Sequence, residues 1–312
     1  MNFRQRLNLV SPERETVLTI GVFDGVHRGH SHLLQRLISL ARPDFQPAVL
    51  TFSNHPVTVL QPQRQVSFLT TSDEKERLLR SEGIELVVSL EFTEELAQLS
   101  AREFVSLLVD SLNMKGLVVG PDFALGRNRE GTTGRLAELG QEMGFFVYVS
   151  EPLLLEETLV KSRVIRQKIS EGDVATTRRL LGREYSLTGQ VITGDRRGRQ
   201  LGFPTANVDV SKAMAHPADG IYATWAVVDG VRRPSATSIG VRPTFGLTER
   251  LVEVYILDFD GDLYGQDLEV QFVEKLRDQE TFTSLEALVE QINLDVANTR
   301  ETLAIAGGAN GP

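Results

Sequence analysis

The stretch that decides the fold is Gly21-Val22-Phe23-Asp24-Gly25-Val26-His27-Arg28-Gly29-His30, which places two imidazoles and three glycines in ten residues. Residues 16–20 before it are β-branched and apolar, as a buried strand requires, and apolar residues recur at helical spacing after it, as far as Ala41. A strand-to-helix turn presents free N–H groups and the positive end of the helix dipole, which together bind anions. The stretch therefore predicts a phosphate site, with His27 and His30 facing the same anion because they are three residues apart.

The rest of the first half alternates between strands and helices. Strands are expected at 48–52, 85–90, 117–119 and 145–149, and helices at 72–82 with Ser72 as N-cap, from the capping box at Ser100, and at 134–143. Such alternation predicts an α/β unit with a parallel sheet, whose ligands bind beyond the carboxyl ends of the strands.

The second half, from about Tyr185, has a different pattern. Strand-like runs at 185–193, 221–228, 251–257 and 268–273 are separated by turn signals such as Asp229-Gly230, which is typical of a hairpin. A second capping box at Thr283 begins a helix expected to run to about Ala304. This half therefore reads as all-β: a small antiparallel barrel followed by one C-terminal helix.

Composition limits the classes of function. A formal net charge of −9 argues against broad nucleic-acid binding, which requires many Lys and Arg contacts to phosphates. The absence of cysteine excludes disulfides and thiolate zinc sites, and no apolar run has the length of a membrane span or a signal peptide. We expect a cytoplasmic protein that acts on small molecules, without nucleic acid or membrane partners, either as a monomer or as a weak homo-oligomer.

The ten-residue stretch resembles the adenylyltransferase half of the bacterial bifunctional riboflavin kinase/FAD synthetases, whose pattern is close to G-x-F-D-G-x-H-x-G-H. The resemblance implies a Rossmann-like nucleotidyltransferase domain over residues 1–183 that converts FMN and ATP to FAD, with His27 and His30 as catalytic residues. Near phosphates these histidines are expected to be protonated more readily. The implied ATP ligands are Gly21, Phe23, Asp24, Gly25, His27, His30, Ser162 and Arg166. The segments 51–56 and 120–126 also match, and imply a flavin site with Asn54, His55, Pro56, Asp122 and Phe123.

Three residues depart from the adenylyltransferase pattern. Leu125 replaces an aromatic residue, and Lys161 and Arg163 replace hydroxyl residues in the segment thought to meet the triphosphate. The two basic residues preserve attraction to anions, but a charge on a long stem does not reproduce the geometry of a short hydroxyl donor. Whether they impair adenylylation stays open at this point.

The second half resembles a riboflavin kinase domain over residues 184–306, with 307–312 as a flexible tail. Gly202-Phe203-Pro204-Thr205-Ala206-Asn207 matches G-x-P-T-A-N, which implies that Thr205 and Asn207 hold Mg²⁺ and ATP, together with Gly198, Gly202 and Pro204. Glu253 matches the general base. Arg242, Thr244, Arg277 and Phe282 are the implied flavin ligands, while Gln279 and Thr281 replace an acid and a base of the family pattern, with altered flavin affinity as the expected result.

These observations predict an enzyme with two active sites, which phosphorylates riboflavin to FMN and adenylylates FMN to FAD. Three alternatives remain at this stage. The first is a kinase whose N-terminal half has lost adenylyltransferase activity, and the second is a flavin sensor without turnover. The third is a nucleotidyltransferase for a nicotinate, pantetheine or cytidine substrate, which the kinase-like string at 202–207 disfavours.

Overall fold

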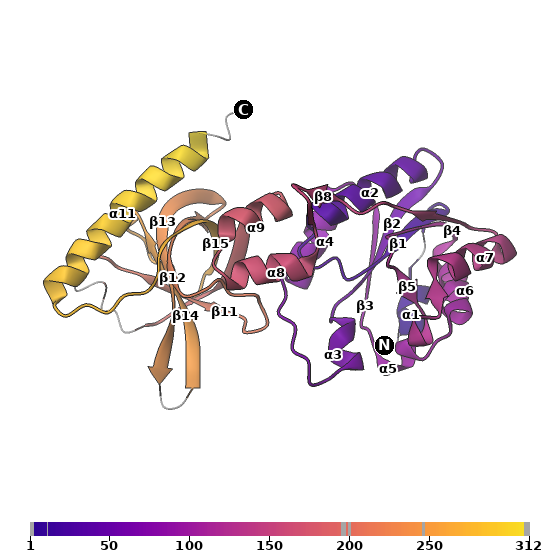
Figure 1. Cartoon of the computed structure of the whole chain (residues 1–312), viewed down its shortest axis with the longest axis horizontal. Helices are drawn as coiled ribbons and strands as arrows, with labels where there is room; N and C mark the ends of the chain where they lie inside the picture. The colour runs from indigo at the N-terminus through magenta and orange to yellow at the C-terminus, as the bar shows by residue number, and fades with distance from the viewer. Residues whose placement is uncertain (1–2, 11, 195–197, 199–200, 245–246, 309–312) are drawn as a thin grey trace. The chain divides into compact units, whose positions relative to one another are not determined.

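The structure is a computed structural model that describes residues 3–10, 12–194, 198, 201–244 and 247–308, and the side chains of these residues except 241–249 and 308. The chain divides into two compact units, Met1–Ser162 and Arg163–Pro312 (Figure 1). Of the described helices, none has both the length and the apolar character needed to cross a membrane.

The first unit contains a five-stranded parallel sheet in the order β3-β2-β1-β4-β7. Its strands are β1 (Thr16–Ile20), β2 (Gln46–Phe52), β3 (Leu86–Leu90), β4 (Met114–Val119) and β7 (Phe146–Val149). The helices are α1 (Phe3–Asn8), α2 (Arg28–Ala41), α3 (Pro56–Leu60), α4 (Ser72–Ser81), α5 (Glu94–Ala97), α6 (Ala101–Leu112) and α7 (Thr133–Met143). Two short hairpins, β5 (Ala124–Leu125) with β6 (Gly131–Thr132) and β8 (Leu154–Leu155) with β9 (Thr158–Leu159), and the 3-10 turn η1 (Arg127–Arg129) complete the unit.

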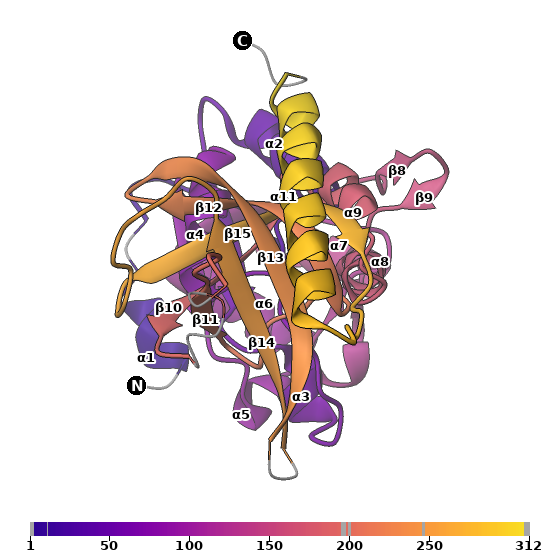
Figure 2. The same ribbon diagram turned by 90° about the vertical axis from the view of Figure 1, so that its left-hand side faces the viewer.

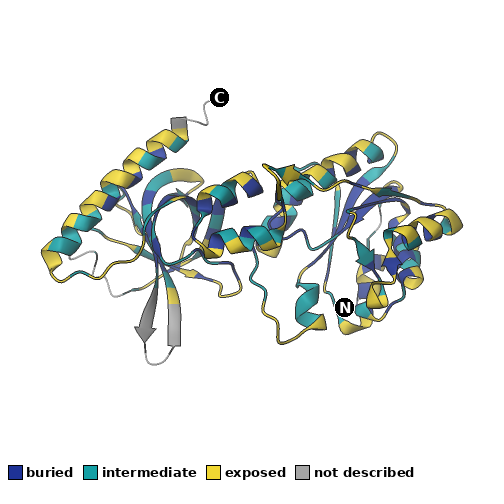
Figure 3. Ribbon diagram, in the orientation of Figure 1, coloured by how far each residue is buried: buried dark blue, intermediate teal, exposed yellow. Residues whose placement is uncertain are grey.

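Helices cover both faces of this sheet. Successive side chains of a strand point to opposite faces, so neighbouring residues of β1 pack in two different cores. Val17 of β1 belongs to a core cluster with Leu34 of α2 and Leu79 of α4. Its neighbour Leu18 belongs to the other cluster, with Leu108 of α6. Every residue of β1 is buried, as Figure 3 shows for the centre of the sheet, so the apolar run at 16–20 is explained by burial on two sides.

The helix N-termini agree with the capping signals to within one residue, whereas the final helix, expected to end at about Ala304, runs to Gly308. The capping box at Ser100 is confirmed: Ser100 and Glu103 exchange hydrogen bonds with each other's backbone N–H groups. The other two predicted caps are wrong by one position. Thr71, not Ser72, caps α4, and the Ala287 N–H donates to Ser284 Oγ, which makes Ser284 rather than Thr283 the cap of the final helix. Adjacent hydroxyl residues offer the backbone equivalent acceptors, so sequence alone does not separate them.

The second unit is built around a closed antiparallel barrel in the order β10-β11-β14-β13-β12-β15. Its strands are β10 (Tyr185–Ile192), β11 (Ala206–Val210), β12 (Gly220–Val228), β13 (Val231–Thr244), β14 (Leu247–Ile256) and β15 (Asp267–Arg277). The predicted fold class is therefore confirmed for both halves. The sequence analysis did not predict β11 or β13. Pro234 and Pro243 interrupt the β13 pattern, because proline removes a ladder donor.

The final helix, α11 (Leu285–Gly308), lies along the outside of the barrel (Figure 2). It contacts β12, β13 and β15, where Leu303 packs against Ala223 and Val273. Asp295 and Thr299 of the same helix are also buried, so α11 presents polar as well as apolar groups to the barrel.

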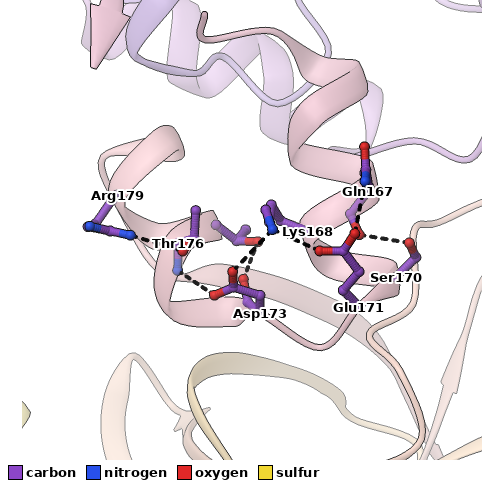
Figure 4. Close-up of polar contacts among 8 residues, drawn as sticks. Gln167, Lys168, Ser170, Glu171, Asp173, Thr176 and Arg179 are labelled. Atoms are coloured by element: carbon purple, nitrogen blue, oxygen red, sulfur yellow. Dashed lines mark hydrogen bonds and ion pairs between the residues drawn. The ribbon is translucent and has the colours of Figure 1, made fainter. Parts of the chain in front are cut away.

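Two further helices precede the barrel, α8 (Ser162–Ser170) and α9 (Val174–Leu181). Lys168 of α8 contacts Glu171 at 2.8 Å and Asp173 at 3.6 Å in the turn between them (Figure 4). Asp173 is also the N-cap of α9, because its Oδ1 accepts from the Thr176 N–H at 3.0 Å. Burial raises the pKa of Asp173, but the Thr176 hydrogen bonds and the charge of Lys168 outweigh burial and leave the pKa below its ordinary value.

We predict that Asp173→Ala lowers the free energy of unfolding by about 1 kcal/mol, because the first turn of α9 loses its side-chain acceptor. Asp173→Asn keeps an acceptor and loses only the partly exposed ion pair with Lys168, so its effect should stay below about 0.5 kcal/mol. Urea denaturation of both variants at pH 7 measures the difference. An equal loss in both variants would show that charge, not capping, stabilises this turn.

Candidate active sites

The two histidines of the first unit lie together at the start of α2, directly beyond the carboxyl end of β1. Their rings stack with a centroid separation of 3.6 Å and an interplanar angle of 12°. A β-carbon on Gly29 would come within 2.8 Å of the Val160 carbonyl oxygen and within 3.1 Å of the His27 ring, so no larger residue fits between the histidines without a shift. The predicted placement of both imidazoles at one helix N-terminus agrees with the structure.

A reciprocal capping box sets the protonation of these rings. His27 Nδ1 accepts from the His30 N–H at 3.2 Å, and His30 Nδ1 accepts from the His27 N–H at 3.4 Å. A neutral imidazole that accepts at Nδ1 carries its proton at Nε2. Both rings therefore hold an N–H donor at Nε2, which is the group that a phosphate oxygen requires.

The pKa of His30 is lowered well below its ordinary value, first by burial and then by unfavourable electrostatic interactions of its charged form with His27 and Lys75. In the free protein His30 is thus neutral at pH 7. The sequence analysis expected easier protonation of the histidines, but for the state in which phosphates are bound. Protonation at Nδ1 would also break the hydrogen bond from the His27 N–H. The arrangement favours neutral donors over cations before a nucleotide binds.

Asp24 organises the loop that precedes these histidines. It is 2 % exposed, and its Oδ1 accepts from the N–H groups of Leu69 at 2.9 Å and Thr70 at 3.3 Å. Ser162 Oγ donates to the Asp24 carbonyl oxygen at 3.0 Å, so two of the predicted ATP ligands, far apart in sequence, lie in contact. These bonds hold the shape of the loop.

Lys75 is a residue of this region that the sequence analysis missed. It is 6 % exposed, and its Nζ donates to the Phe52 carbonyl oxygen at 2.6 Å. Burial lowers the pKa of Lys75, and the charge of Asp24 opposes this shift. A buried lysine has no distinct signal in sequence, because a lysine in an amphipathic helix normally faces solvent.

The predicted flavin residues of the first unit lie in the segments that follow β2 and β4, and Asn54 joins its loop to the segment after β3. Asn54 Nδ2 donates to the Phe92 carbonyl oxygen at 2.9 Å, and Asn54 Oδ1 accepts from the Phe92 N–H at 2.7 Å. His55 caps α3 through Nδ1, followed by Pro56 at the first helical position. Phe123 packs against the core of the sheet. These side chains fix the loops at the carboxyl edge of the sheet.

The three departures from the family pattern have different surroundings. Lys161 Nζ lies 3.2 Å from Asp122 Oδ2, so the charge that replaces a hydroxyl has an acidic partner. Leu125 is buried in the core. Arg163 and Arg166 lie on α8, in the second unit.

In the second unit, sheet register places the predicted catalytic residues side by side. Glu253 of β14 is directly opposite Asn207 of β11 on one side and Ser238 of β13 on the other. Directly opposed residues point to the same face of a sheet. Val252 and Val254 alternate with Glu253 and are buried, so Glu253 and its two neighbours share the outer face of the barrel.

A pocket of about 410 Å³ lies near the start of β11, and on β14 it is lined by Val254 and Ile256, which point to the face opposite Glu253. It is lined by Pro204, Thr205 and Ala206, by Val191 of β10 and by the loop 259–264. Gly198 and Gly202 lie in the same region, where the Phe203 N–H donates to the Gly198 carbonyl oxygen at 2.9 Å. Thr205 thus lines the pocket with its hydroxyl, and Asn207 follows it by two residues along the chain, opposite Glu253.

Arg277 makes a bidentate ion pair with Asp295 of α11, at 2.8 Å from Nε and 2.7 Å from a terminal nitrogen. This pair, with burial opposing it, raises the pKa of Arg277. The guanidinium also lies 5.9 Å from the centre of the Phe282 ring. Two predicted flavin residues are therefore adjacent, and Arg277 also fastens α11 to the barrel. The side chains of Arg242 and Thr244 lie outside the described residues.

Comparison with known proteins gives matches over both units. A family model described as FAD synthetase matches residues 10–164, and one described as riboflavin kinase matches residues 181–303. A bifunctional riboflavin kinase/FMN adenylyltransferase from Pseudomonas fluorescens is 39% identical over 300 residues, which cover 95% of this chain and 96% of the relative. The chain belongs to the bifunctional riboflavin kinase/FMN adenylyltransferase family.

A second relative supports the same assignment, and a solved structure has the same overall fold. The Escherichia coli K12 enzyme of that name is 36% identical over 93% of this chain and 94% of its own length. A crystal structure described as a macrolide-efflux protein from Streptococcus pneumoniae has a TM-score of 0.89 and 31% identity, covering 94% of this chain and 96% of the other. The family membership confirms the recognition made from the motifs.

We predict that His30 titrates well below pH 6.5 in the free protein and is the Nε2–H tautomer at neutral pH. Long-range ¹H–¹⁵N spectra, assigned with a His30→Asn variant, report both properties. The unfolded chain binds a proton at His30 at a higher pH than the folded protein does. The contribution of His30 to the free energy of unfolding should therefore decrease as the pH falls below about 6.5. An ordinary titration midpoint, or an Nδ1–H tautomer, would contradict the capping-box argument.

Proposed function

We propose that the two sites catalyse successive steps, with the residues of each site in the roles that follow. As a family member, the protein is a riboflavin kinase and an FMN adenylyltransferase, with riboflavin, FMN and ATP as substrates and FAD as the final product. The observation that carries the assignment of roles is the register that puts Asn207 directly opposite Glu253, two residues after Thr205, which lines a pocket.

In the kinase reaction, the 5′-hydroxyl oxygen of riboflavin attacks the γ-phosphorus of ATP, and the bond from that phosphorus to the ADP oxygen breaks. Glu253 accepts the hydroxyl proton. Thr205 and Asn207, with Gly198, Gly202 and Pro204, hold the nucleotide, and Arg242, Thr244, Arg277 and Phe282 contact the flavin. Catalysis then depends mainly on alignment and on stabilisation of charge.

Magnesium fits the kinase residues. Thr205 and Asn207 offer neutral oxygen ligands, which suit a hard cation that also binds phosphate oxygens and water. Among the described residues no group of three His, Asp or Glu side chains could hold a metal, so phosphates must supply most of the anionic ligands. Bound Mg²⁺ would neutralise charge on the β- and γ-phosphates.

In the adenylylation reaction, an FMN phosphate oxygen attacks the α-phosphorus of a second ATP, and the bond to pyrophosphate breaks. His27 and His30 donate from Nε2 to the phosphates as negative charge moves to the leaving group. Gly21, Phe23, Asp24 and Gly25 shape the loop that receives the nucleotide, and Ser162 and Arg166 hold the β- and γ-phosphates. Asn54, His55, Pro56, Asp122 and Phe123 form the flavin side of this site.

The pairing of Lys161 with Asp122 favours a working adenylyltransferase over a kinase with a vestigial N-terminal half. A lysine whose charge is matched by a carboxylate adds little to the field at the phosphates. We assign adenylylation to residues 1–183 and riboflavin phosphorylation to 184–306, in a cytoplasmic protein.

Glu253→Gln tests the kinase assignment. The amide cannot accept the hydroxyl proton, so riboflavin phosphorylation should fall by about 10²- to 10⁴-fold. Adenylylation of added FMN should not change, because Glu253 belongs to the barrel. Separate assays of FMN and FAD formation on one preparation measure both rates. Full kinase activity in this variant would remove Glu253 from the proposed role.

A matched pair of substitutions tests the role of His30 as an Nε2 donor. His30→Gln carries an N–H donor near the position of Nε2, whereas His30→Asn keeps an acceptor near Nδ1 and loses that donor. We expect FMN adenylylation to fall by about 10²-fold in His30→Asn and by less in His30→Gln. Kinase activity serves as the control for folding. A larger loss in His30→Gln than in His30→Asn would contradict the donor role and indicate that capping of α2 is the main role of His30.

A further inference from the structure

Gln279 lies in the connection between β15 and α11 and is attached to β13. Its Nε2 donates to Ser238 Oγ and to the Ile239 carbonyl oxygen, both at 3.0 Å. Both acceptors belong to the part of β13 that runs beside Glu253, because Ser238 is the cross-strand partner of Glu253. One amide group therefore joins the connection to the strand next to the proposed general base.

Gly240 allows this approach. A β-carbon at position 240 would lie 3.1 Å from Gln279 Nε2, which is closer than most such contacts, and 3.7 Å from its Cδ, which is an ordinary contact. The glycine and the amide thus fit each other, independently of the hydrogen bonds. The same connection is held at its start by Arg277, which donates to the Asp278 carbonyl oxygen at 2.9 Å and pairs with Asp295.

The nucleotide pocket is built from other segments. Its lining comes from β10, from residues 204–206, from β14 and from the loop 259–264, and includes no residue of β13 or of the connection 278–284. A change at Gln279 should therefore act on the wall that carries Phe282 and not on the pocket beside Thr205. Loss of the Gln279 hydrogen bonds should therefore change the KM for riboflavin and leave the KM for ATP unchanged.

We propose that Gln279 is a positioning residue of the kinase site, which uses both amide hydrogens to hold the β15–α11 connection against β13 and so fixes the flavin side of the site. The proposal rests on the kinase function proposed above. Ser238, whose Oγ accepts from Gln279, is the cross-strand partner of Glu253. Gln279 thereby joins the connection to the strand residue opposite the base.

Gln279→Glu in the full chain tests this role. The carboxylate has nearly the same shape but donates no hydrogen bond, and it repels the Ile239 carbonyl oxygen. We expect the KM for riboflavin to rise about fivefold, as the loss of roughly one hydrogen bond implies. The KM for ATP and the rate of FMN adenylylation should stay within about twofold of the original values. Gly240→Ala should reproduce the effect from the other side of the contact.

Gln190→Glu is the matched control, because Gln190 Nε2 also donates to a backbone carbonyl oxygen, that of Gly265, at 3.0 Å. It lies on β10, away from the connection, and should leave the KM for riboflavin unchanged. Riboflavin binding measured by fluorescence gives a second readout that needs no turnover, and its dissociation constant should also rise about fivefold in Gln279→Glu.

Two results would overturn the proposal. One is a riboflavin KM and dissociation constant in Gln279→Glu equal to those of Gln190→Glu. The other is a parallel rise in the KM for ATP with a lower melting temperature, which would show a general loss of barrel structure. Failure of the original protein to phosphorylate riboflavin would instead refute the proposed function, and the binding measurement would still decide the role of Gln279.

Discussion

The kinase site depends on the register of three barrel strands. Side chains along a strand alternate between faces, so a slip of one residue in β14 would move Glu253 into the core and bring Val252 or Val254 outside. The buried valines make that slip costly, since each would lose its burial. Hydrophobic packing inside the barrel therefore holds a row of polar groups on its outer surface, with Asn207 and Ser238 on either side of the base.

The N-terminal site has a different local origin. There the backbone N–H groups at the start of α2 are satisfied by the imidazoles of His27 and His30, and this capping fixes both the ring positions and the tautomer. Burial keeps His30 neutral before the nucleotide arrives. The two halves of the chain thus prepare phosphate chemistry by different means: helix capping supplies donors in one, and strand pairing aligns a base with oxygen ligands in the other.

The sequence predicted what is local or periodic. The histidines are three residues apart on one helix, and the alternation of strands and helices indicated the parallel sheet, so both could be read directly. The contacts of Asn54 with Phe92, of Lys161 with Asp122 and of Gln279 with Ser238 join residues about 40 positions apart, and no spacing rule connects them. Strand β13, with two prolines, lacked a strand signal, and the neighbours of Glu253 could not be assigned without it.

The central claim is that one polypeptide carries both steps of FAD formation. The most direct measurement incubates the intact protein with riboflavin, Mg²⁺ and excess ATP, and separates riboflavin, FMN and FAD by chromatography over time. The account predicts that riboflavin declines, FMN appears first, and FAD then accumulates together with pyrophosphate. FMN that accumulates without FAD, or riboflavin that is not consumed, would contradict it.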